Sequence, residues 1–216
     1  MNSLSEENYL KVIYSLAQRE NVKVSITAIA EALGNNTASV IDMIKKLTEK
    51  QLVEYNKKTG VFLTRKGRND AIQIVRKHRL WEVFLLEKLG YKWDEIHDIA
   101  EELEHITDHT LPDRLDKFLG FPEYDPHGDP IPKSNGEIPG TSKVVLTEIA
   151  KGKTCRVVAV KDTSSVFLQY LQQLGISIGT KIKVLDKIPF DNSMVIQIGK
   201  NNQTVSAKLG ESVLVD

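Results

Sequence analysis

The chain has 216 residues, of which 41% are hydrophobic and 27% charged, and its 29 basic side chains balance 29 acidic ones. This length allows a sizeable core and favours two domains of ordinary size. The first residues show no basic segment followed by an apolar run, and no stretch of eighteen apolar residues follows, which argues against a signal peptide or membrane span and predicts a cytoplasmic protein.

Charge is distributed unevenly along the chain. Residues 34–68 carry eight basic side chains against three acidic ones, a balance of +5. Residues 91–129 carry twelve acidic side chains against three basic ones, a balance of −9, and all five histidines lie between His78 and His127. A basic region is therefore followed by an acidic, histidine-bearing region, and we expect the two to have different tasks.

The first third of the chain has the order of elements of a winged helix. Apolar residues repeat at helical spacing over residues 5–19, and a short second helix is expected between the N-cap Ser25 and the stop signal Gly34. A third helix is predicted over residues 36–51, followed by two strands around a turn at residues 57–60. The inward face of the third helix is expected to comprise Val40, Ile41, Ile44 and Leu47.

In such an arrangement the third helix enters the major groove and a basic hairpin tip meets phosphate. Small hydroxyl side chains permit close approach, and lysines supply attraction independent of sequence. Winged helices also serve as protein-interaction modules, but the +5 balance disfavours that alternative. Asp42 must accept from a cytosine amino group or point away from DNA. The expected DNA-binding residues are Asn36, Thr37, Ser39, Asp42, Lys45, Lys46, Lys57 and Lys58.

Two further predicted helices carry ligand-type side chains. The first spans about residues 66–89 and places His78 and Glu82 one turn apart. The second spans residues 96–109 and is amphipathic, and by itself its polar side is most simply a solvated surface. Two helices that each carry a carboxylate and an imidazole one turn apart are nevertheless how a helical scaffold builds a metal site. The apolar side comprises Ile96, Ile99, Ala100, Leu103 and Ile106, and the polar side His97, Glu101, Glu104, His105 and Asp108.

The run RKHRLWEVFLLEKLGYKWDEIHDIAEELEH, followed by RLDKFLGFP and PHGDPIP, resembles the diphtheria toxin repressor family of iron- and manganese-dependent bacterial repressors. The resemblance covers nearly the whole chain and includes the histidine and carboxylate spacings. It implies a mainly α-helical fold with a small β-barrel. The implied parts are a winged helix-turn-helix domain (1–66), a helical metal-binding and dimerisation domain (67–124), a linker with candidate ligands (125–143) and an SH3-like, FeoA-type barrel (144–216).

The resemblance also implies two metal positions per subunit. The first would use Glu101, Glu104, His105 and a residue near position 8, which is Asn8 where relatives have aspartate or methionine. The second would use His78, Glu82, His97 and later ligands matching His127 and Asp162, with Asp125 standing where close relatives have cysteine. Lys11 stands where one manganese subgroup has a ligating glutamate, which puts the bridged two-manganese geometry of that subgroup in doubt.

Carboxylate, amide and imidazole donors without thiolate suit Mn²⁺ or Fe²⁺. Zn²⁺ and Co²⁺ bind the same donors at least as tightly and are expected to substitute in vitro. We favour manganese slightly over iron.

Beyond the acidic region, Leu111, Leu115, Phe118 and Leu119 lie on one face of a further helix. This face belongs either to the subunit's own core or, as the resemblance implies, to a two-fold dimer interface suited to a palindromic operator. From residue 141 onward, short β-branched strands surround one helical piece. The single cysteine, Cys155, excludes an internal disulfide and is expected to be a small core residue.

The implied function is that of a homodimeric repressor, not an enzyme, that binds double-stranded DNA and represses metal-uptake genes when Mn²⁺ or Fe²⁺ is bound. Metal would join the first helix to the helices bearing Glu101, Glu104 and His105, and metal and DNA would each tighten binding of the other. No membrane partner or small organic substrate is expected. Two alternatives stay open: a metal-dependent hydrolase, for which the chain offers no separate acid-base and oxyanion groups, and a regulator sensing an organic ligand, which would be indifferent to chelators.

Overall fold

The computed structural model describes residues 2–18, 23–140 and 142–216, so position 19 of the first predicted helix and position 141 at the start of the β-rich part lie outside it. The chain divides into two compact units, which are described separately. The first unit comprises Met1–His78, Glu101–Arg114 and Pro132–Glu137. The second comprises Arg79–Ala100, Leu115–Ile131 and Ile138–Asp216.

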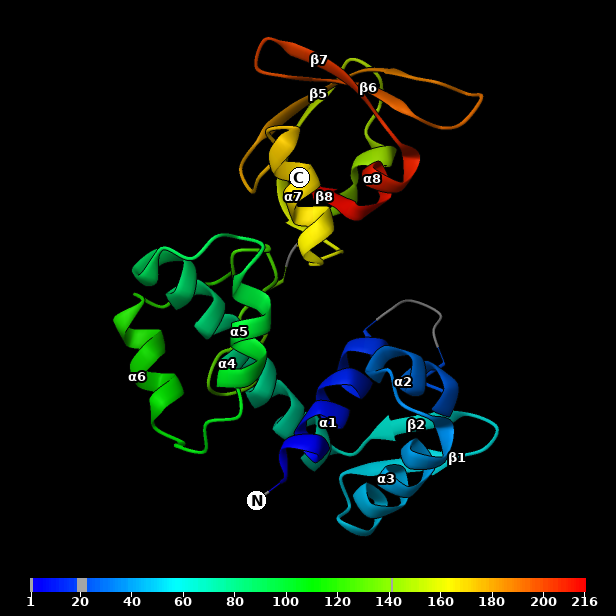
Figure 1. The fold of residues 1–216 in the computed structure, drawn as a ribbon, viewed down its shortest axis with the longest axis vertical. Coiled ribbons are helices and arrows are strands. Elements are labelled where there is room, and N and C mark those ends of the chain that lie inside the picture. Colours follow the sequence, from blue (N-terminus) through cyan, green and yellow to red (C-terminus); the bar gives the residue numbers. More distant parts are fainter. Residues whose placement is uncertain (1, 19–22, 141) are drawn as a thin grey trace. The chain divides into compact units, whose positions relative to one another are not determined.

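The N-terminal part of the first unit is a winged helix, as predicted (Figure 1). Three helices pack together and two strands form an antiparallel hairpin whose tip lies between Asn56 and Gly60. Ser3, Ser25 and Asn36 cap the helices, each accepting a backbone N–H three residues further on. The elements are α1 (Leu4–Ala17), α2 (Ile26–Leu33), α3 (Thr37–Glu49), β1 (Val53–Asn56) and β2 (Gly60–Leu63).

One predicted core position of α3 is wrong. Val40, Ile44 and Leu47 are buried, whereas Ile41 is 42% exposed. The three buried residues repeat at intervals of four and three and form one stripe of the helix. Ile41 lies about 100° from Val40 around the helix axis, on the side that also carries the exposed Asp42.

Helix α4 (Arg65–Leu89) has the predicted length and continues from the first unit into the second. Helix α5 (Ile96–Leu103) ends well before residue 109, where the sequence pattern had placed its end. The reason is local: the Asp108 carboxylate accepts the backbone N–H groups of Thr110 and Leu111, and this turn begins α6 (Leu111–Phe118). No helix of the described ranges is long and apolar enough to cross a membrane.

The helical part of the second unit has its own apolar core. Leu80, Val83, Leu115 and Ile131 are buried together, with Trp81, Phe84 and Leu119 packed against them. Leu115 of α6 therefore belongs to the subunit's own core. Phe118, on the same helix, remains 65% exposed.

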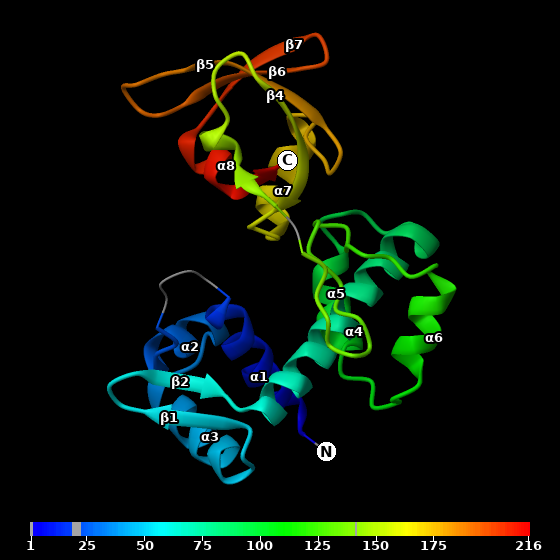
Figure 2. The same cartoon turned by 180° about the vertical axis from the view of Figure 1, so that it is seen from behind.

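The C-terminal part of the second unit is a six-stranded antiparallel sheet in the order β3-β8-β4-β5-β6-β7. The sheet is not closed, so the expected barrel is an open sheet whose strand β3 has only two residues. Figure 2 shows this part from behind, with α7 (Ser165–Gln173) and α8 (Ala207–Ser212) beside the strands. Cys155 is buried in it, as expected. The strands are β3 (Val144–Val145), β4 (Thr154–Val160), β5 (Lys181–Lys187), β6 (Met194–Ile198), β7 (Asn201–Val205) and β8 (Val213–Val215), and a 3-10 turn spans Leu146–Glu148.

A buried carboxylate, Glu6, joins α1 to α3. Its Oε1 atom lies 2.7 Å from Lys50 Nζ and 3.1 Å from Lys46 Nζ, and its Oε2 atom accepts the Ser3 backbone N–H at 2.8 Å. Burial opposes ionisation, but the hydrogen bonds from Lys50, Ser3 and Lys46 outweigh it and lower the pKa of Glu6 to about 2.

Replacing this carboxylate should weaken the winged helix in a pH-dependent way. We expect Glu6→Gln to lower the free energy of unfolding at pH 7 by roughly 1–3 kcal/mol, because charge-assisted hydrogen bonds are lost. Since the folded pKa of about 2 lies below the ordinary 4.5, the contribution is complete above pH 4.5 and disappears as the pH falls toward 2. Urea unfolding of both proteins at pH 7 and pH 3 measures this, with the exposed Glu31→Gln as control. A difference that does not shrink at pH 3 would contradict it.

Candidate metal centres and DNA-binding surface

The first unit holds three candidate ligand side chains, one on α1 and two directly after α5. Glu104 is fully buried, and its Oε1 atom accepts no hydrogen bond from the described residues. The Asn8 Oδ1 atom is likewise buried without a described hydrogen-bond partner. His105 Nε2 lies 3.8 Å from Glu104 Oε1. A buried carboxylate oxygen that no protein group satisfies fits a divalent cation, and amide oxygen and imidazole nitrogen complete a suitable donor set.

His105 is oriented by a residue that the sequence analysis missed. The Glu7 Oε2 atom lies 2.6 Å from His105 Nδ1. When Nδ1–H donates to Glu7, the His105 Nε2 atom keeps its lone pair for a cation, as in many carboxylate–histidine–metal arrangements. The two residues are 98 positions apart, so no local pattern could link them, although Glu7 stands next to the candidate ligand Asn8.

Lys11 of α1 reaches the same group of side chains. Its Nζ atom donates to Glu101 Oε1 at 2.5 Å and to Glu104 Oε2 at 2.6 Å, and it lies 3.2 Å from His78 Nδ1. His78 Nδ1 is also 2.7 Å from Glu104 Oε2. The resemblance assigns His78 to the second metal position and Glu101 and Glu104 to the first. The structure brings these three side chains together.

The second unit contains a separate cluster of buried ligand-type groups. Glu82, Asp125 and His127 each offer one ligand atom, and these atoms lie within 4.8 Å of one another. His127 Nδ1 is 3.5 Å from Glu82 Oε1, while its Nε2 atom is buried without a described hydrogen-bond partner. His97 Nδ1 lies 3.2 Å from the same Glu82 oxygen. The free imidazole nitrogen of His127 fits a metal here also.

Asp125 is held by its own loop. Its Oδ1 atom accepts the backbone N–H groups of His127 and Asp129, and its Oδ2 atom lies 3.4 Å from Arg79 Nε. Burial, together with the charges of Glu82 and Asp129, raises the pKa of Asp125 to about 7. Asp162 does not join this cluster among the described residues, and its carboxylate accepts the Ser164 backbone N–H instead.

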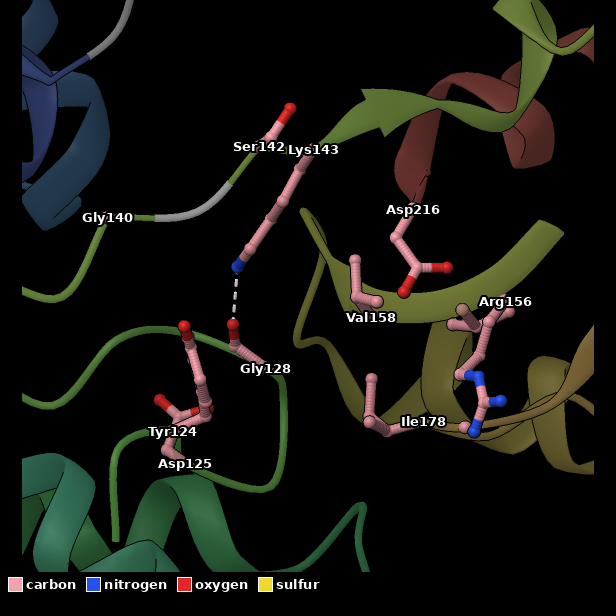
Figure 3. A pocket seen from close by; sticks show the side chains of 12 residues that line it. Tyr124, Asp125, Gly128, Gly140, Ser142, Lys143, Arg156, Val158, Ile178 and Asp216 are labelled. Carbon is pink, nitrogen blue, oxygen red and sulfur yellow. Dashed lines mark hydrogen bonds between the residues drawn. The ribbon is translucent and has the colours of Figure 1, made fainter.

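The loop that carries His127 is fixed to the C-terminal sheet. Gly128 has φ +84°, and a Cβ atom there would lie 1.9 Å from the Val158 carbonyl oxygen. The His127 carbonyl accepts the backbone N–H of Val160 at 3.0 Å. Figure 3 shows Lys143 donating to the Gly128 carbonyl beside a cavity of about 430 Å³. The Trp93 ring stacks on the His127 ring at a centroid distance of 5.9 Å.

The predicted DNA-binding residues are exposed on α3 and on the hairpin tip. Asn36 caps α3 through the Ser39 N–H, and Asp42 pairs with Lys45 at 3.1 Å. Lys46 contacts the buried Glu6. Lys23, which sequence analysis missed, donates to the Lys58 carbonyl at 2.6 Å and adds a cation beside the hairpin tip. The exposed residues are Asn36, Thr37, Ser39, Asp42, Lys45, Lys46, Lys57 and Lys58.

Comparison with known proteins gives matches along almost the whole chain. Residues 1–61 match the family description "Iron dependent repressor, N-terminal DNA binding domain", residues 64–133 match "Iron dependent repressor, metal binding and dimerisation domain", and residues 144–216 match "FeoA domain".

Complete relatives and solved structures agree with these matches. The iron-dependent repressor IdeR of Mycobacterium leprae is 31% identical over 100% of this chain and 99% of its own. A manganese-dependent transcriptional repressor in complex with manganese is 37% identical, with a TM-score of 0.87 over 97% of this chain and 98% of its own. ScaR with bound Zn²⁺ is 30% identical, with a TM-score of 0.82 over 98% of each chain. The chain therefore belongs to the diphtheria toxin repressor family of metal-dependent, DNA-binding transcriptional repressors.

Proposed function

We propose that this chain is a cytoplasmic, homodimeric repressor that binds a palindromic operator and represses metal-uptake genes when Mn²⁺ or Fe²⁺ is plentiful. The observation that carries this proposal is the Glu104 Oε1 atom, which is buried without a described hydrogen-bond partner beside His105. A carboxylate oxygen in that state is costly unless a cation balances it. The set of oxygen and nitrogen donors suits both Mn²⁺ and Fe²⁺, and we favour manganese slightly.

The first proposed metal position uses Asn8, Glu104 and His105. A bound divalent cation would supply the positive charge that joins α1 to the end of α5. Asn8 contributes an amide oxygen from α1, and Glu7 holds the His105 ring so that its Nε2 atom stays available. Because α1 is part of the winged helix, affinity for metal and affinity for DNA become coupled.

The second proposed position uses Glu82, His97 and His127. The first two side chains come from α4 and α5, and the third from the loop attached to β4. We assign Asp125 chiefly to holding that loop, since both of its oxygens already have partners. A ligand role for Asp162 stays a prediction from the family resemblance.

A dimer interface is proposed at the end of α6. Phe118 and Phe121 are each 65% exposed, which is unusual for two aromatic side chains three residues apart. Burying them against a second copy would remove apolar surface from water and place two winged helices on one operator.

The two alternatives are not favoured. The relatives named above are repressors rather than hydrolases. A regulator of an organic ligand would bind DNA equally well in chelator, which the next experiment measures.

The first proposed position should control operator binding. In a fluorescence-anisotropy titration with a family-type palindrome, we expect Mn²⁺ added after chelator to tighten binding by a factor on the order of 10–100. Fe²⁺ under anaerobic conditions, Co²⁺ and Zn²⁺ give the order of potency. Glu104→Gln and His105→Ala should lose most of the gain, because each removes a donor, whereas the exposed Glu102→Gln should keep it. Normal operator binding by both variants with and without metal would refute this mechanism.

The lysines of the hairpin tip should act without regard to DNA sequence. Lys57→Met combined with Lys58→Met is expected to weaken binding to operator and unrelated DNA alike, because phosphate contacts are lost. The slope of log affinity against log salt should become shallower by about 1 per lysine that contacts phosphate. Lys200→Met combined with Lys208→Met, at two exposed positions of the C-terminal part, is the charge-matched control. An unchanged slope would exclude these lysines from the interface.

His127 should be needed for the second position only. We expect His127→Ala to bind one Mn²⁺ fewer per chain than the wild type in equilibrium dialysis with elemental analysis, because the free Nε2 donor is gone. The exposed His109→Ala should keep the wild-type count. An unchanged count in His127→Ala would place the second ion elsewhere.

A further inference from the structure

Lys11 places a positive charge where the other side chains are metal-ligand types. Its side chain is only 15% exposed, and its Nζ atom contacts Glu101 and Glu104 at 2.5 and 2.6 Å. His78 Nδ1 lies 3.2 Å from the same nitrogen. Two carboxylates and an imidazole from two other segments of the chain therefore surround one ammonium group.

The two oxygens of Glu104 have different surroundings. Oε2 is contacted by Lys11 Nζ at 2.6 Å and by His78 Nδ1 at 2.7 Å. Oε1 is buried, has no described hydrogen-bond partner, and lies 3.8 Å from His105 Nε2. A carboxylate can accept on both oxygens at once. The Oε2 atom of Glu104 is thus paired with the ammonium group of Lys11, whereas its Oε1 atom is available to a bound metal ion.

This arrangement has an electrostatic consequence. A fully buried carboxylate needs a compensating charge even when no metal is present. Lys11 supplies that charge from α1, so α1 is tied to Glu101 and Glu104 in the metal-free chain. A metal that occupied the position of the ammonium would have to displace a covalently attached competitor.

We propose that Lys11 is a built-in cation that stands in for a divalent ion among His78, Glu101 and Glu104. The position formed by Asn8, Glu104 and His105 then holds a single divalent ion beside an ammonium group. This inference rests on the proposed metal-dependent function. It adds that only one divalent ion binds next to α1 in the wild type. Removing the ammonium should open its position beside Glu101, His78 and the second oxygen of Glu104 to one more ion.

Counting bound Mn²⁺ in full-length variants tests this inference. We expect Lys11→Met to bind one Mn²⁺ more per chain than the wild type in equilibrium dialysis with elemental analysis. Its metal-free thermal midpoint should fall by a few degrees, because Glu104 loses its counter-charge, and Mn²⁺ should raise that midpoint by more than in the wild type. Lys11→Gln is a second neutral variant. Lys11→Arg keeps the positive charge and should keep the wild-type count.

Lys77→Met is the matched control for loss of one positive charge nearby. Lys77 donates to the Ile106 carbonyl at 3.4 Å, so its removal vacates no position among Glu101, Glu104 and His78. We expect it to bind the wild-type number of ions. An extra ion in Lys77→Met would overturn the inference, because general electrostatics would then explain the gain.

The outcomes separate this inference from the proposed function. A wild-type ion count in both Lys11→Met and Lys11→Gln, with metal-dependent operator binding intact, would overturn the role of Lys11 alone. A neutral variant that folds only when Mn²⁺ is present would support it, since the added ion then replaces the lost ammonium. Failure of the wild type to bind either Mn²⁺ or, under anaerobic conditions, Fe²⁺ would overturn the proposed function and this inference together.

Discussion

The buried carboxylate of Glu104 is the constraint on which the rest of the first unit depends. Its charge is balanced from α1, through Lys11, and the neighbouring Glu7 of α1 holds His105. The same helix contacts the C-terminal end of α3 through Glu6, which lies beside Lys46 and Lys50. Helix α1 therefore makes charged contacts in two directions, with Glu101 and Glu104 through Lys11 and with α3 through Glu6. A change in the charge at Glu104 acts on the helix that also supports the DNA-binding surface, which gives the proposed coupling a physical route.

In the second unit, ring stacking and backbone contacts hold a candidate metal ligand in place. His127 is held between the Trp93 ring and the backbone of β4, and Gly128 allows the close approach that any larger residue would prevent. The C-terminal sheet thus positions a candidate metal ligand without supplying a described ligand side chain of its own. Without that sheet, His127 would keep its imidazole donor but lose the backbone contacts that orient it. In the second proposed position, a domain whose fold indicates no activity would thus contribute to metal affinity by orienting a ligand.

Sequence patterns predicted the winged helix well because its signals are local. Caps at Ser25 and Asn36 lie within three residues of the groups they satisfy. The same kind of signal, at Asp108, was overlooked because the apolar period continued to Ile106, so α5 was predicted too long. The contacts of Glu7 with His105 and of Lys11 with Glu101 join residues 98 and 90 positions apart. Periodic patterns in the sequence cannot predict contacts over such separations. The family resemblance named most of the candidate ligands and placed Lys11 at a ligand position, and the folded chain adds the contacts of this lysine with His78, Glu101 and Glu104.

Charge balance gives a reason why one divalent ion suits the first cluster. Glu7, Glu101 and Glu104 carry three negative charges, and Lys11 carries one positive charge. With neutral imidazoles the metal-free cluster has a net charge of −2, which one divalent cation neutralises. A second divalent ion would leave the cluster at +2 around the fully buried Glu104, where water cannot screen the excess. The ammonium of Lys11 therefore does more than occupy space: it sets the charge that remains for metal, and it ties this count to the helix that belongs to the DNA-binding domain.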